Sequence, residues 1–314
     1  MMPLLIGITV DAMTVATLLL NVGFALLVGA MLTSWQTQAS TSDWSRLQHR
    51  QMRRLIFFSI GQVLAAMSVV LVLETATMAD VPLREALPSI LSVLSSTHFG
   101  QMWSAGLGFI VLILLLQLLG TVTSLRYLIS AIGLAGFAVT RSLVSHAVAA
   151  GSVSWPIAIE TAHLLLISLW LGEVVIAGMF ILRTPCGPRR EDRADCSRYI
   201  AQLSTSATIA LIGIVATGVV NAWRGLGSPQ HIVDTAWGVI LLAKFAGVVV
   251  AVLLGAVNRW LVMSKFLRHL QSRSLEAVAA QRLFALVLQM ESIVLMAVLF
   301  AAALLSSSAP PATL

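Results

Sequence analysis

The chain has 314 residues, of which 58% are hydrophobic and only 10% are charged, and its mean hydropathy is +0.94. Soluble domains carry about 25% charged residues, so this composition excludes a free soluble globular protein. A formal charge of +6 would suggest nucleic-acid binding in a soluble chain. In a membrane protein the same excess is explained by Lys and Arg on the cytoplasmic side, so we expect no nucleic-acid partner.

Eight apolar segments follow one another along the chain, each near the length of about 20 residues that crosses a bilayer as a helix. They run over 11–34, 55–78, 99–119, 126–150, 157–182, 202–223, 236–258 and 283–306. The sequence therefore predicts an all-α, polytopic helix bundle in a lipid bilayer.

Two further segments help to define this bundle. The first basic residue, Arg46, comes only after the first apolar segment. A secretory signal opens with basic residues, so we expect the first helix to be retained. Segment 83–97 is shorter and contains charged residues and Pro88, which predicts a helix at the membrane surface.

The basic residues are distributed very unevenly between the two predicted membrane faces. The loops on one face carry 15 of the 19 Lys and Arg residues, whereas the loops on the other face carry only Arg84 and Arg224. Because basic loops stay in the cytoplasm, this asymmetry predicts an even number of helices with both termini outside, in the periplasm.

A short internal repeat suggests two parallel halves. Thr97-His98-Phe99-Gly100 precedes the third apolar segment, and Thr235-Ala236-Trp237-Gly238 precedes the seventh. Both read Thr-x-aromatic-Gly and both are entered from outside. We expect two parallel four-helix halves, 1–150 and 151–314, within one integral membrane domain. Chance similarity between apolar helices is the alternative.

Polar residues near the outer face form a candidate metal site. His146 ends the fourth segment, and Glu160 and His163 lie three residues apart on one face of the fifth. A short loop makes these helices antiparallel neighbours, so the three side chains are expected at one membrane level. Imidazole and carboxylate groups bind transition metals. The alternative is that these are interfacial polar residues with satisfied hydrogen bonds, which would give the same sequence pattern. His98 is a weaker candidate at the same face.

Charged residues inside the predicted spans are costly and usually functional. Glu173 and Glu291 are expected at comparable depth in the inner half, where Met290 is a possible soft ligand beside Glu291. Either carboxylate could equally be structural. Arg141 and Lys244 lie in the outer half, where we expect them to neutralise acidic partners.

Two cysteines, Cys186 and Cys196, fall in a loop predicted to be cytoplasmic. Cytoplasmic thiols are normally reduced, so we expect two free thiols, with a transient metal exit site as the alternative. The sequence has no G-x-x-x-x-G-K-[ST] loop for ATP, and we expect a protein that is not an enzyme.

An ordered series of short segments resembles the copper resistance protein D (CopD) family over about 140–306. The series is Ser145-His146-Ala147, His163-Leu164-Leu165, Ser168-Leu169-Trp170-Leu171-Gly172, Gly218-Val219-Val220-Asn221-Ala222-Trp223, Thr235-Ala236-Trp237-Gly238, Leu241-Leu242-Ala243-Lys244 and Asn258-Arg259. The first half is similar mainly in its topology and in Thr97-His98-Phe99-Gly100. Glu173 departs from the family pattern, which has a small residue after Trp-Leu-Gly.

The resemblance implies an eight-helix protein of the bacterial inner membrane that transports copper ions, commonly from periplasm to cytoplasm. It also implies a separate periplasmic copper carrier of the CopC type as a partner. By position, His146 and His163 become the metal-handling residues, and Glu160 joins them from helix geometry. The mixed ligands are compatible with Cu(II) or Cu(I).

Two other functions stay open. His146 and His163 could be axial ligands of haem b in an electron-transfer protein. The protein could also bind copper as a sensor or scaffold without transporting it. The sequence does not define the oligomeric state.

Overall fold

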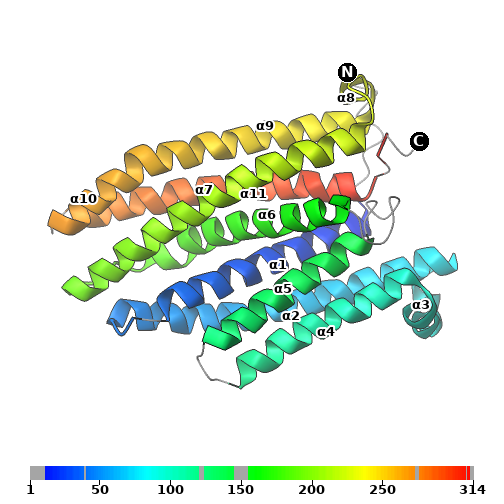
Figure 1. Cartoon of the computed structure of the whole chain (residues 1–314), viewed down its shortest axis with the longest axis horizontal. Coiled ribbons are helices and arrows are strands. Elements are labelled where there is room, and N and C mark those ends of the chain that lie inside the picture. The colour runs from blue at the N-terminus through cyan, green and yellow to red at the C-terminus, as the bar shows by residue number, and fades with distance from the viewer. Residues whose placement is uncertain are drawn as a thin grey trace.

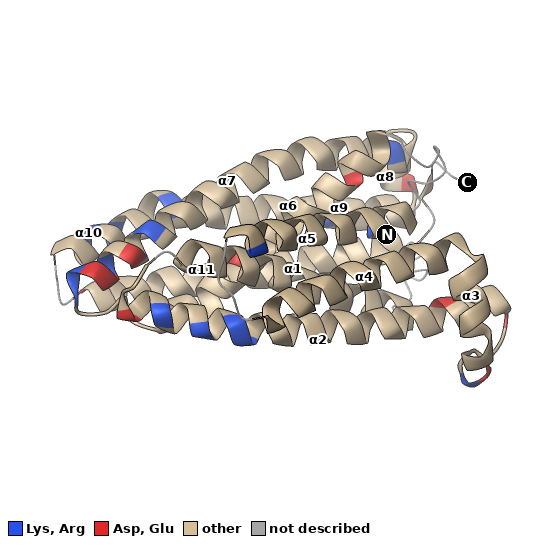
Figure 2. Ribbon diagram, turned by 60° about the horizontal axis from the view of Figure 1, so that its bottom comes forward, with Lys and Arg blue, Asp and Glu red and all other residues tan. Residues whose placement is uncertain are grey.

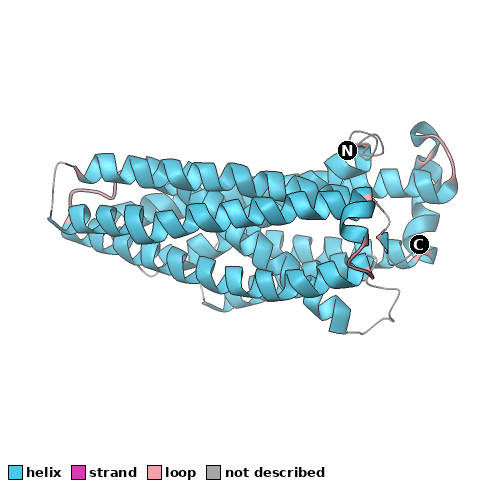
Figure 3. Ribbon diagram, turned by 90° about the horizontal axis from the view of Figure 1, so that it is seen from above, coloured by secondary structure: helices cyan, strands magenta, loops and turns pink. Residues whose placement is uncertain are grey.

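The computed structural model describes residues 11–38, 40–119, 124–144, 155–272, 276–308 and 310–311. Every regular element in these ranges is a helix, and the long helices run lengthwise beside one another (Figure 3). The described chain is therefore an all-α bundle, as its composition predicts.

Eight helices of the described chain are long and apolar enough to cross a membrane, which confirms the expected number. They are α1 (Ala12–Thr37), α2 (Asp43–Ala79), α4 (His98–Leu118), α5 (Ser124–Val144), α6 (Trp155–Met179), α7 (Arg190–Leu226), α9 (Ala236–Val257) and α11 (Ala277–Ser306). Shorter helices connect them: η2 (Leu83–Glu85), η3 (Leu87–Ser89), α3 (Ile90–Ser96), η5 (Ile181–Arg183), α8 (His231–Asp234), η6 (Asn258–Met263) and α10 (Ser264–Ser272).

Several helices extend well beyond their apolar segments. Helix α2 begins at Asp43 and α7 at Arg190, about twelve residues before the predicted spans in each case. Arg, Lys, Gln and Glu are good helix formers, so a helix continues past the point where its side chains stop being apolar. At the start of α2, the Ser42 side chain accepts a hydrogen bond from the backbone N–H of Ser45 and fixes the helix end there.

Helix α6 occupies the middle of the bundle. It packs against α1, α5, α7 and α11, whereas α2, α4 and α9 lie further out (Figure 1). Adjacent pairs also pack tightly: α1 with α2, α4 with α5, and α9 with α11. Side chains on α6 are therefore the ones placed to reach several other spans.

Two glycines allow α1 and α6 to cross at very short range. A Cβ atom built on Gly172 would lie 2.1 Å from the carbonyl oxygen of Ala25, and one built on Gly29 would lie 2.5 Å from the carbonyl carbon of Gly172. No larger residue fits at either position without moving backbone. Small residues at crossings of this kind are typical of helix packing in membranes.

The two Thr-x-aromatic-Gly segments form the same local structure. Thr97 caps α4 and Thr235 caps α9, each accepting from the glycine N–H three residues later at 3.0 Å. Each threonine hydroxyl also donates to a carbonyl in the short helix before it, that of Val93 at 2.6 Å or His231 at 2.7 Å. This shared geometry supports the internal repeat, while the arrangement of two complete halves stays a prediction.

The two ends of the bundle differ in charge. The start of α1 and the end of α11 lie together, because the hydroxyls of Thr14 and Ser307 are 2.8 Å apart. Beside them, hydrogen bonds from the backbone and hydroxyl of Thr14 lower the pKa of the Asp11 carboxyl. Most Lys and Arg residues gather at the opposite end, around α10 and the beginnings of α2 and α7 (Figure 2). Which side of the membrane this end faces stays a prediction.

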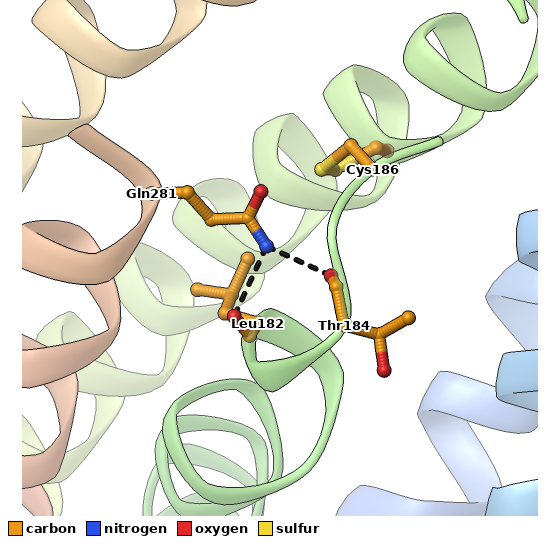
Figure 4. The surroundings of a disulfide bond; sticks show 5 residues. Leu182, Thr184, Cys186 and Gln281 are labelled. Atoms are coloured by element: carbon orange, nitrogen blue, oxygen red, sulfur yellow. Dashed lines mark hydrogen bonds between the residues drawn. A yellow bond between two sulfur atoms is a disulfide. The ribbon is translucent and has the colours of Figure 1, made fainter. Parts of the chain in front are cut away.

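The expectation of two free thiols is wrong in this structure, because Cys186 and Cys196 form a disulfide. Their Cα atoms are 5.7 Å apart, within the range a disulfide needs. The chain turns back between η5 and α7 and buries both side chains. Next to this turn, the Gln281 amide donates to the carbonyls of Leu182 at 3.0 Å and Thr184 at 2.8 Å (Figure 4).

Candidate functional site

His163 lies between helices in the half of α6 nearer the termini. Its Nδ1 is 2.8 Å from the hydroxyl of Thr217 on α7. The ring also packs against α7 at Gly218, where an added Cβ would lie 3.1 Å from the imidazole Cε1. Thr217 thus holds the ring in one orientation, and Nε2 is the nitrogen placed to bind another group.

The groups around His163 carry charges of both signs. Glu160, one turn earlier on α6, interacts electrostatically with Arg141 on α5, and Lys244 on α9 lies close enough to His163 to act on it. The sequence expectation that Arg141 neutralises an acidic partner agrees with this pairing. A cation entering here would compete with Arg141 for the Glu160 carboxylate.

The third member of the predicted outer site, His146, lies outside the described residues. In the part of the chain that the structure describes, no group of three or more His, Cys, Asp or Glu side chains could hold a metal ion. Glu160 and His163 thus share a helix face as predicted, but their joining with His146 stays a prediction.

His98 is not brought to His163 by any contact in the described chain. It is the first residue of α4, it is exposed, and its Nε2 lies 3.2 Å from the carbonyl oxygen of Leu143 near the end of α5. This contact ties the ends of two neighbouring helices together, which is the role of an interfacial polar residue.

Glu173 is fully buried near the end of the bundle that carries the basic residues. Its carboxylate accepts hydrogen bonds from the Gln36 amide on α1 at 3.4 Å and from the Ser206 hydroxyl on α7 at 2.5 Å. The carboxylate also lies close enough to the phenol of Tyr199 on α7 to act on it electrostatically. Glu173 therefore faces α1 and α7, at a different depth from His163.

Glu291 on α11 is buried in different surroundings. The indole Nε1 of Trp170 on α6 donates to its carboxylate at 3.1 Å. Helix α9 approaches the same carboxylate at Gly255, where a Cβ would lie 3.5 Å from Oε1. Met290 is 49% exposed on the outside of α11, so the structure does not bring its sulfur to Glu291.

Sequence reasoning did not single out the polar residues around Glu173. Tyr199 is completely buried, and it is followed at helical spacing by Gln202 and Ser206. That spacing of three and seven residues puts all three on one face of α7. A polar stripe next to an apolar span was the signal that could have identified them.

Two family models match the chain in order. The N-terminal domain model of copper resistance protein D-like proteins matches residues 8–155, and the copper resistance protein D model matches residues 197–305. Both fall on the eight-helix bundle described above. The chain belongs to the copper resistance protein D family. No curated protein and no solved structure matches the chain.

The family matches distribute the candidate residues unequally. His98 and His146 fall inside the N-terminal match, and Glu291 and Met290 fall inside the C-terminal one. Helix α6, with the remaining candidates, lies almost entirely between the two matched segments. Membership of the family thus indicates a membrane protein related to copper, while the roles of residues on α6 depend on their own geometry.

Proposed function

We propose that this protein transports copper ions across the bacterial inner membrane, from periplasm to cytoplasm, and that the ion enters near His163. The observation that carries the proposal is the ordered match of both family models over an eight-helix bundle. The proposed role is transport of an ion rather than catalysis. In this proposal both termini lie in the periplasm, where a CopC-like carrier delivers copper.

The surroundings of His163 support a metal-handling role. Metal-binding histidines usually engage their second ring nitrogen in a hydrogen bond that fixes the ring, as Thr217 does here through Nδ1. The proposed ligand atom is therefore Nε2 of His163, with His146 as its partner and the Glu160 carboxylate nearby. Such imidazole and carboxylate ligands suit Cu(II), while Cu(I) prefers sulfur.

The path proposed for the ion then follows α6 toward the basic end of the bundle. Glu173 lies ten residues beyond His163, which is about 15 Å along a helix. Glu291 reaches the same region from α11 through Trp170. Two buried carboxylates would lower the energy of a cation crossing an otherwise apolar span.

Reconstitution tests the proposal. Purified protein in proteoliposomes should accumulate copper in a saturable way, and empty vesicles prepared in parallel should not. Uptake no greater than that of empty vesicles would overturn the transport function. A haem Soret band in the purified protein would favour the electron-transfer alternative instead.

A single variant tests the entry site. His163→Ala should lower copper affinity at least tenfold, because loss even of a supporting residue typically costs 10–100-fold. His269→Ala is the matched control, since His269 lies in α10 at the other end of the bundle, where its Nε2 is 3.4 Å from a carboxylate oxygen of the exposed Glu276. Equal uptake by wild type and His163→Ala, at equal protein levels, would remove His163 from the site.

A further inference from the structure

Inside the bundle Glu173 contacts Gln36, Tyr199 and Ser206. Thr33 contacts Tyr199, and Gln202 lies between Tyr199 and Ser206 on the same face of α7. We call this group the oxygen cluster, and its members are Thr33 and Gln36 of α1, Glu173 of α6, and Tyr199, Gln202 and Ser206 of α7. None of them offers an imidazole or a sulfur. The cluster is therefore chemically distinct from the His163 site, from which it is separated by about 15 Å along α6.

Helix geometry and direct contacts both support this convergence. Thr33 and Gln36 are three residues apart on α1, so they share a face. Gln36 reaches Glu173 from α1 at 3.4 Å and Ser206 reaches it from α7 at 2.5 Å. The Tyr199 hydroxyl lies close to both Glu173 and Thr33. The carboxylate thus joins all three helices.

Several oxygen atoms of the cluster are buried and lack a well-formed hydrogen bond. They are Thr33 Oγ1, Gln36 Oε1, Tyr199 OH and Gln202 Oε1. Thr33 and Tyr199 are themselves almost completely buried, at 0% and 2% exposed. Leaving buried polar atoms without partners costs free energy, and native proteins satisfy nearly all of them. The hydroxyls of Thr33 and Tyr199 can pair with each other, but the two buried amide oxygens have no partner among the described residues, which indicates a missing ligand.

We propose that the oxygen cluster binds a hard monovalent cation such as Na⁺. An amide oxygen can only accept, so Gln36 and Gln202 need a donor or a cation. A proton on Glu173 would supply one donor and leave the other acceptors unmet, whereas one cation contacts several oxygens together. Hard cations take carboxylate, carbonyl and hydroxyl oxygens as ligands, while copper favours imidazole and sulfur.

The charge of the cluster selects a monovalent ion. Its one carboxylate has only uncharged partners among the described residues, namely Gln36, Ser206 and Tyr199. A buried charge without compensation is strongly unfavourable in a membrane. One bound Na⁺ would make the cluster neutral, whereas a divalent ion would leave a buried positive charge.

Cation binding can be measured without copper. The purified full-length protein, in detergent with a copper chelator, is titrated with NaCl against choline chloride at constant ionic strength. Na⁺ should raise the melting temperature saturably, by roughly 4–10 °C at 100 times its dissociation constant. Saturable ²²Na⁺ binding should follow the same curve. Equal melting temperatures in NaCl and in choline chloride would overturn the proposal.

Variants locate the ion. Glu173→Gln should abolish both the thermal shift and ²²Na⁺ binding, and Gln202→Leu should weaken binding at least tenfold. Glu74→Gln is the matched control, because this carboxylate lies in α2 outside the cluster. It should bind Na⁺ as the wild type does.

If Glu173→Gln does not fold, Na⁺ binding by Tyr199→Phe and Gln202→Leu decides the question. Wild-type Na⁺ binding in folded cluster variants would overturn the assignment. These measurements do not involve copper, so a protein that failed to transport copper could still bind Na⁺ at this cluster.

Discussion

The two buried carboxylates, Glu173 and Glu291, accept hydrogen bonds from different partners. Glu173 has flexible amide and hydroxyl groups around it, whereas Glu291 accepts from the rigid indole of Trp170. A rotatable hydroxyl or amide can reorient toward an ion, but an indole offers one fixed N–H. The surroundings of Glu173 are therefore more adaptable than those of Glu291, whose hydrogen bond is fixed by the indole.

Replacing the indole tests that hydrogen bond. Trp170→Phe should destabilise the protein by about 1–3 kcal/mol, because a buried acceptor loses its donor. Thermal unfolding in detergent measures the change. Trp223→Phe is the control, since Trp223 is 65% exposed and its replacement should change stability by no more than about 0.5 kcal/mol. Equal effects of the two variants would contradict a special role for the bond between Trp170 and Glu291.

For individual residues, the sequence identified the candidate side chains more reliably than the contacts between them. His163, Glu173 and Glu291 stand out because ionisable groups are rare in apolar helices. The pairing of Glu160 with Arg141, and the convergence on Glu173, depend on which faces of α1, α5 and α7 meet α6. The free-thiol prediction failed for a similar reason: it used the expected compartment, whereas the turn before α7 brings Cys186 and Cys196 together.

Among the helices, the closest approach is the crossing of α1 with α6 at Gly29 and Gly172. This crossing lies next to Glu173 in the sequence of α6, and it brings α1 near enough for Gln36 to reach that carboxylate. A wider separation would lengthen a hydrogen bond that is already 3.4 Å. The oxygen cluster therefore depends on two residues that contribute no side chain to it.

Gly172→Ala should separate the two helices. Its Cβ would lie 2.1 Å from the Ala25 carbonyl oxygen, and overpacking of this kind typically costs about 1–3 kcal/mol. Thermal unfolding measures the loss. Gly61→Ala is a suitable control, because nothing lies within 4 Å of the added Cβ on the exposed face of α2. That variant should be neutral or up to about 1 kcal/mol more stable, since Ala favours helix. A harmless Gly172→Ala would contradict the close crossing.

The number of long helices was predictable from the sequence, but the residues at which some of them begin were not. Apolar length determines how many segments can span a bilayer, and that count of eight is confirmed for the described chain. The starts of α2 and α7 were misplaced because charged residues continue these helices outside the apolar core, whereas α9 (Ala236–Val257) agrees with its predicted span. Segment 83–97 was correctly placed outside the spans, where it forms η2, η3 and α3.

Over the whole molecule, charge is segregated along the long axis of the bundle. The polar helix extensions place Lys and Arg at the end away from the start of α1 and the end of α11 (Figure 2). Basic segments are retained in the cytoplasm during insertion. We therefore expect a single orientation, with both termini in the periplasm.

Reporter fusions test this orientation. Alkaline phosphatase fused after Leu314 should be active and green fluorescent protein fused there should be dark, because the first folds in the periplasm and the second in the cytoplasm. Fusions after Gly187, in the turn between η5 and α7 at the basic end, should give the opposite pair of results. A fluorescent fusion at the C-terminus would contradict the orientation and reverse the proposed direction of entry.

The continuity of helix α6 links the positions of the candidate residues that it carries. It holds His163, Trp170 and Glu173 within eleven consecutive residues of one continuous helix, and an unbroken helix is stiff over such a length. A piston-like or rotational step of α6 would therefore displace the His163 imidazole and the Glu173 carboxylate together. Binding of an ion at one of these sites would therefore shift the position of the other site directly through the helix, without a relay of intermediate side chains.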